Sequence, residues 1–162
     1  MKKKIIFNSL IFSFLIILYS FQITEIIDYC KEDEAKKKCT ELLKDYKYDL
    51  SKITKFSSKE SIQKKVYEIP VYFGEKYKLI WSTIGSPEKV EVAIYSKGPE
   101  SKNRELLFSN KNIPANQTEF TFSPDKSKKM FLEYTIPAAT VAKKGCIVFM
   151  MGFEVKKIVT KK

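Results

Sequence analysis

Histidine is absent from this chain of 162 residues. Its absence removes the imidazole general base, the Ser-His and Cys-His nucleophile pairs and the commonest metal ligand. Aspartate occurs only five times, never in the spacing of a calcium loop, and the five glycines are isolated, so no phosphate-binding or dinucleotide-binding loop is present. We therefore expect a protein that is not an enzyme and that holds no cofactor or metal. The alternative is a hydrolase whose catalytic carboxylates are brought together only by the fold.

Arginine is also scarce, because Arg104 is the only one among 30 basic residues. The planar fork of arginine usually reads phosphates and base edges, so nucleic acid is not an expected partner. The formal net charge of +11 is interpreted mainly as a solvated lysine surface. A dedicated anion site is the alternative, with candidates in the stretch "SPDKSKK" and in the last seven residues. These candidates are Lys126, Lys128, Lys129, Lys156, Lys157, Lys161 and Lys162.

The first 22 residues consist of three early lysines followed by a largely apolar run over residues 5–20. This order is typical of a secretory signal, and the run is shorter than the roughly 20 residues of a comfortable membrane span. We expect an exported protein, periplasmic or extracellular. No good small-x-small cleavage site precedes residue 23, so an uncleaved membrane anchor is the alternative. Cleavage would leave 30 − 3 = 27 basic and 19 acidic residues, a net charge of +8.

A helix is predicted over residues 23–46, where apolar side chains recur at helical spacing. Ala35, Cys39, Leu42, Leu43 and Tyr46 share one face, which is the face expected to dock. Residues 47–65 are more polar and are predicted to be a connecting segment. Residues 157–162 form a basic tail.

The stretch over residues 66–156 changes to short apolar and aromatic runs separated by glycine, proline and other turn residues. Alternation supports strands, since Tyr77, Leu79 and Trp81 share one side and are expected in the core. These features predict an antiparallel β-sandwich of about seven strands, either jelly-roll or immunoglobulin-like, with one N-terminal helix. The predicted strands are residues 66–73, 77–83, 90–96, 104–109, 118–122, 130–136 and 146–155.

The stretches "VYFGEKYKLIW", "VEVAIYSK", "RELLFS", "FTFSPDKSKKMFLEYTIPA" and "GCIVFMMGF" resemble a group of small exported bacterial β-sandwich proteins without an assigned function. They are more distantly similar to the pre-peptidase C-terminal type of sandwich, an accessory module of secreted enzymes. The resemblance covers about residues 39–154 and rests on the texture of the strands rather than on a catalytic motif. It implies a sandwich fold and no active site.

The three cysteines bear on compartment and fold. An exported protein usually pairs its cysteines, and Cys39 lies on the apolar face of the predicted helix. We therefore predict a Cys39–Cys146 disulfide that joins the helix to the last strand, with Cys30 unpaired. The alternative is that Cys146 is a buried free thiol.

These features together predict a non-catalytic protein that acts by binding or structural association at the bacterial cell envelope. Its expected partner is another protein or an anionic envelope polymer. Contact with a membrane is expected only through an uncleaved N-terminus, as a membrane-tethered scaffold.

Overall fold

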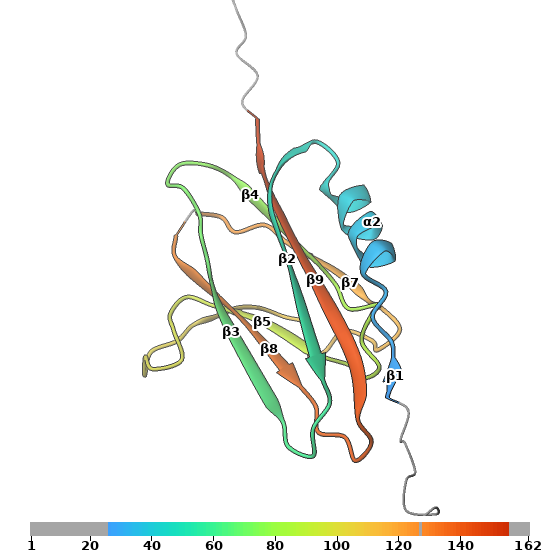
Figure 1. The fold of residues 1–162 in the computed structure, drawn as a ribbon. Helices are drawn as coiled ribbons and strands as arrows, with labels where there is room; N and C mark the ends of the chain where they lie inside the picture. The colour runs from blue at the N-terminus through green and yellow to red at the C-terminus, as the bar shows by residue number, and fades with distance from the viewer. Residues whose placement is uncertain (1–25, 127, 156–162) are drawn as a thin grey trace, which may run out of the picture.

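Two β-sheets pack face to face, with one helix on the outside of the first sheet (Figure 1). The computed structural model describes residues 26–126 and 128–155. The helix-side sheet has the order β2, β9, β4, β7, with the short β1 pairing parallel to the start of β9. Its strands are β1 Ile27–Asp28, β2 Tyr46–Ser57, β4 Tyr77–Ser82, β7 Glu119–Phe122 and β9 Lys143–Glu154. The open sheet contains β3 Gln63–Ile69, β8 Met130–Ile136, β5 Glu91–Tyr95 and β6 Leu106–Ser109, in that order.

The strand pairing is that of a jelly roll. β2 pairs with β9, β3 with β8, β4 with β7 and β5 with β6, all antiparallel, as in one long hairpin of eight strands. Further pairs, β4 with β9 and β5 with β8, roll this hairpin into two sheets. The predicted β-sandwich with one N-terminal helix is therefore confirmed, and of its two versions the strand order selects the jelly roll.

The main core lies between the sheets and is built from the inward side chains of alternating strands. Trp81 is fully buried there and stacks between Phe108 and Phe149, with ring centroids 5.6 and 5.4 Å away. The prediction that Trp81 fills the core is confirmed. Its two ring partners come from opposite sheets, so the aromatic stack joins the two layers.

Helix α2, Glu32–Leu43, covers the outer side of β9 and β4. Ala35, Cys39 and Leu43 are its buried residues, and they pack on Ile80 and Val148 in a second core. The apolar face predicted from the sequence is therefore the face that docks.

The helix is shorter than the predicted span of 23–46, of which residues 23–25 lie outside the described residues. Residues 27–28 extend along β9 instead, and three acids in the first turn favour the observed start. At the other end, Lys44 takes φ 46 and ψ −112, a backbone conformation that cannot continue the helix.

The prediction that residues 47–65 form a connecting segment is wrong. Most of it is β2, a strand of 12 residues, and its last residues belong to β3. β2 pairs only with β9 and lies at an edge of its sheet, so only Thr54 and Phe56 are buried. An edge strand with many lysines shows little apolar alternation, which explains why its sequence resembles a loop.

Candidate functional site

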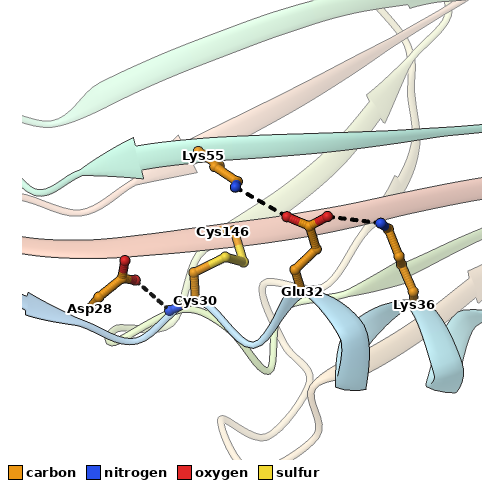
Figure 2. The surroundings of a disulfide bond; sticks show 6 residues. All are labelled: Asp28, Cys30, Glu32, Lys36, Lys55 and Cys146. Carbon is orange, nitrogen blue, oxygen red and sulfur yellow. Dashed lines mark hydrogen bonds and ion pairs between the residues drawn. A yellow bond between two sulfur atoms is a disulfide. The ribbon is translucent and has the colours of Figure 1, made fainter.

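A disulfide joins Cys30 to Cys146, with a sulfur–sulfur distance of 2.09 Å and 116 residues between the two cysteines (Figure 2). The predicted Cys39–Cys146 bridge is therefore wrong, and Cys30, expected to be unpaired, is the partner. Cys146 lies at the start of β9, where the segment before the helix runs alongside it. Cys39 is seven residues into the helix, about 10 Å further along its axis, which is too far for a disulfide.

Cys39 is a free thiol that is fully buried between α2 and the helix-side sheet. Burial, with a smaller contribution from the charge of Glu119, raises the pKa of this thiol to about 12. The thiol therefore stays neutral at ordinary pH, whereas a reactive cysteine needs a thiolate. Cys39 is a small apolar side chain of the second core.

The loop after β4 holds the disulfide end of β9 in place. The amide of Cys146 donates to the carbonyl of Gly85 at 2.8 Å. A Cβ atom at Gly85 would lie 2.8 Å from the Cys146 sulfur and 2.9 Å from the backbone nitrogen of Lys31. Only glycine lets this loop lie against the bridge, so the helix start, the loop and β9 form one packed unit.

A pocket of about 450 Å³ opens beside this disulfide. The residues that line it come from β1 and the segment after it, from the end of β2, from the loop to β3, from β3 itself and from the start of β9. They are Asp28, Cys30, Lys55, Phe56, Ser57, Lys59, Gln63, Lys65, Lys144 and Gly145. We call this cavity the lysine pocket, because its four lysines and one aspartate give a formal charge of 4 − 1 = +3.

The four lysines of the pocket differ in whether their ammonium group already has a partner. Lys55 lies 3.1 Å from a carboxylate oxygen of Glu32, whose other oxygen accepts from Lys36 at 2.8 Å (Figure 2). These hydrogen bonds, first from Lys36 and then from Lys55, lower the pKa of Glu32. Lys65 donates to the backbone carbonyl of Lys55 at 2.9 Å.

Lys59 and Lys144 are exposed, and neither forms an ion pair with any acid among the described residues. The single acid of the pocket, Asp28, accepts a hydrogen bond from the amide of Cys30 at 2.9 Å (Figure 2). Lys59 and Lys144 therefore carry positive charge that no ion pair of the described residues offsets, whereas Lys55 is paired with Glu32. Ammonium groups around a cavity of this size can hold a carboxylate, sulfate or phosphate group.

The lysines proposed from the sequence as anion ligands are placed differently. Lys126 and Lys128 line a smaller pocket of about 300 Å³ that also contains Glu105 and Asp125. Lys128 lies 3.9 Å from Glu105, and Lys129 pairs with Glu68 at 2.8 Å. Acids therefore offset these lysines, in contrast to the lysine pocket. Lys156, Lys157, Lys161 and Lys162 lie outside the described residues.

Two carboxylates, those of Glu105 and Asp125, line this smaller pocket. Glu105 is 70% exposed and faces a lysine, which is the arrangement of a surface ion pair. A catalytic acid usually sits in a water-poor environment that changes its affinity for protons. Across residues 26–126 and 128–155, no group of three or more potential ligands is arranged to hold a metal ion.

Sequence reasoning missed Lys55, Lys59, Lys65 and Lys144. Lys55, Lys59 and Lys65 lie in the stretch predicted to be a connecting segment, and Lys144 follows Lys65 by 144 − 65 = 79 residues. Their common position depends on the pairing of β2 with β9, which places Lys55 opposite Cys146. The only available signal was the density of lysine between residues 52 and 65.

Within the part of the chain that the structure describes, no helix is long and apolar enough to cross a bilayer. No protein-family model matches the sequence, and no curated protein matches it. The resemblance to small exported sandwich proteins therefore stays a prediction.

Proposed function

We propose that this protein is an exported, non-catalytic binding module of the bacterial cell envelope that holds an anionic polymer in its lysine pocket. The single observation that carries the proposal is that two lysines of this pocket have no ion-pair partner in the described part of the chain. Lys59 and Lys144 approach it from different strands and loops, and neither has an acidic partner among the described residues. Cations gathered without counter-charges attract a polyanion and release its counterions on binding.

Two observations support export. The lysine-then-apolar order of the first 22 residues is that of a secretory signal. The Cys30–Cys146 disulfide is the kind of bond that forms and persists in oxidising compartments such as the periplasm or the medium.

A polymer fits the lysine pocket better than a compact metabolite does. The pocket is wide and lies at the surface, with Phe56 as its main apolar contact. Small ligands usually bind where most of their surface becomes buried, whereas a chain of repeated anionic groups needs only local contacts with several cations. Sulfated or phosphorylated glycans and polyphosphates have the required repeated charge.

Binding to heparin and to inorganic polyphosphate at low ionic strength tests this proposal. We expect the variant Lys59→Glu/Lys144→Glu to bind about ten-fold or more weakly, because two attractive charges become repulsive. The affinity of the unmodified protein should fall steeply as salt is added.

The matched control is Lys97→Glu/Lys102→Glu, which changes the net charge equally at two exposed lysines of the loop between β5 and β6. We expect this control to lose no more than about three-fold in affinity. Equal losses in the two variants would show that only the overall charge matters and would overturn the proposed pocket. The proposal would also fail if neither polyanion bound at low salt.

A further inference from the structure

Another cavity opens along one side of the sandwich, between the edge strands β2 and β3 (Figure 1). Within the described residues, β2 pairs only with β9 and β3 only with β8, so each strand has one edge without a partner strand. The cavity has a volume of about 390 Å³, and its walls come from these two strands and from β8 and β9. We call it the edge cleft, and its chemistry depends on Leu50, Lys52, Tyr67, Ile69, Leu132 and Phe149.

The inner wall of the edge cleft is apolar. Leu132 of β8 and Phe149 of β9 belong to the main core, as does the buried Ile69 of β3. Leu50 of β2 is partly buried and packs against the same core. A cavity of this size with mostly apolar walls and few polar groups is typical of a small-molecule site. The main part of a ligand in the edge cleft would therefore be apolar.

One cation faces this apolar space. Lys52 is the β2 residue opposite Phe149 of β9, and residues paired in this way point to the same face of a sheet. Because Phe149 points into the core, the side chain of Lys52 also leaves β2 on its inner face. Its ammonium group lies 4.1 Å from the centre of the Tyr67 ring on β3. Lys52 forms no ion pair within residues 26–126 and 128–155.

The acid that lines the edge cleft does not offset this cation. Glu68 lies between Tyr67 and Ile69, which point inward, so its own side chain points to the outer face of the open sheet. There it pairs with Lys129 at 2.8 Å. The charge of Lys52 is therefore available, and the edge cleft is complementary to an anionic group rather than to a cation.

We propose that the edge cleft binds a small amphiphile of the fatty-acid class, a single apolar chain that ends in a carboxylate. The chain packs on Leu132 and Phe149, and the carboxylate accepts hydrogen bonds from the ammonium group of the exposed Lys52. This site is separate from the lysine pocket and takes a different class of ligand from the anionic polymer proposed there.

An added peptide strand fits the same edges less well. Strand addition needs a row of free backbone groups on the edge strand. On β2, the carbonyls of Lys55 and Ser57 already accept hydrogen bonds from the side chains of Lys65 and Gln63, at 2.9 and 2.8 Å. Only a short stretch of this edge is left for a peptide, whereas an acyl chain needs no backbone partner.

Trp81 reports on this site in the full chain. It is the only tryptophan, is fully buried and stacks on Phe149 of the inner wall, with ring centroids 5.4 Å apart. A decanoate with bromine at the end of its chain should therefore quench Trp81 emission on binding, because bromine quenches only at short range. Unbrominated decanoate should bind with a similar affinity in titration calorimetry and quench much less.

The variant Lys52→Met tests the role of the anionic group. We expect it to weaken decanoate binding about ten-fold or more, because the carboxylate loses a charged hydrogen-bond partner. The matched control is Lys47→Met, which removes the same charge from the same strand outside the edge cleft. Lys47 also contacts a ring, 5.7 Å from the centre of Phe153. This control should change the affinity by no more than about two-fold.

A ligand of opposite charge completes the test. Decyltrimethylammonium has the same chain and should bind the unmodified protein at least about ten-fold more weakly than decanoate. Equal affinities for these two amphiphiles, or equal losses in the two lysine variants, would overturn the proposal. So would a lack of decanoate binding below its micelle-forming concentration, or binding without quenching of Trp81 by the brominated form.

The two proposed sites can fail independently. The Lys59→Glu/Lys144→Glu variant should keep its affinity for decanoate within about three-fold, and Lys52→Met should keep its affinity for polyphosphate within the same limit. Loss of polyphosphate binding with decanoate binding retained would count against the lysine pocket alone, and the reverse result would count against the edge cleft alone.

Discussion

The outer faces of the two sheets differ in what covers them: the apolar face of a helix packs on one, and paired charged side chains lie on the other. The helix-side sheet is buried on both sides, because α2 covers Ile80 and Val148 on its outer face. The outer face of the open sheet has no such cover among the described residues. Its centre is occupied by Glu133, which pairs with Lys64 and Arg104 at 3.0 Å each.

The reason for this difference is already visible in the central strands. β9 contains the continuous run "CIVFMM", all of it buried, so apolar side chains point to both faces. In β8, Leu132 and Tyr134 point inward and alternate with Glu133 and Thr135. A strand that is apolar on both faces requires a second layer, whereas an alternating strand can leave one face to solvent.

The comparison teaches that the third layer of this sandwich is a consequence of strand composition. The helix is held by apolar packing along its length and by the disulfide just before its first turn. At its other end, Lys78 donates to the carbonyl of Leu42 at 2.7 Å. On the outer face of the open sheet, the corresponding contacts are the ion pairs of Glu133 and a contact between a cation and an aromatic ring. In that contact the guanidinium carbon of Arg104 lies 3.8 Å from the centre of the Tyr95 ring.

The largest effect is expected from a charge placed under the helix. Val148→Lys should destabilise the protein by more than about 4 kcal/mol or prevent folding, because it buries an unpaired ammonium group. The matched substitution on the other sheet, Thr135→Lys, places the same side chain on a partly exposed outer face and should cost only about 0.5 kcal/mol. Urea unfolding measures both. Similar losses for the two variants would show that the faces do not differ as described.

Loss of the disulfide should have the next largest effect. The variant Cys30→Ser/Cys146→Ser should lose about 2–5 kcal/mol of unfolding free energy, because the unfolded chain is freed from a long closed loop. Urea unfolding with and without a reducing agent measures this loss, and the reductant should affect the wild type but leave the variant unchanged. Peptide mass mapping should find Cys30 joined to Cys146 and Cys39 as a free thiol. A bridge containing Cys39 would contradict the structure.

The smallest effect is expected at Glu133 on the open sheet. Burial raises the pKa of this carboxyl, but the hydrogen bonds from Lys64 and Arg104 outweigh it, and the pKa is lowered from its ordinary value of 4.5. Its stabilising contribution is therefore complete above pH 4.5 and is lost as the pH falls through the lower, folded-state pKa. Glu133→Gln should cost about 1–2 kcal/mol at pH 7 and flatten the decline of stability in acid.

The control for this prediction is Glu68→Gln, which breaks the more exposed pair with Lys129 on the same sheet. Its effect on the unfolding free energy at pH 7 and on the decline of stability in acid should be much smaller than that of Glu133→Gln. If stability declined in acid equally in both variants and in the wild type, titration of Glu133 would not be the cause of that decline.

Most of the fold could be predicted from local patterns. All seven predicted strands correspond to observed strands, and residues 130–136 match β8 at both ends. Two strands were missed: β1, which has two residues, and β2, which is stabilised by backbone pairing with β9 rather than by its own apolar side chains. Such pairing depends on a partner nearly a hundred residues away and leaves no local pattern. The candidate site shares this origin, because β2 and β9 contribute Lys55 and Lys144 to the lysine pocket.

By itself, the sequence determined the sandwich class, the docking face of the helix and the burial of Trp81, since these follow from periodicities of two and 3.6 residues within short stretches. Only the tertiary structure decided the partner of Cys146, the position of β2 and the gathering of lysines beside the disulfide. Each of these depends on the distance between segments that are remote in the chain. Cys39 has the apolar surroundings expected of a bridge partner, but Cys30 is the residue that passes within reach of Cys146.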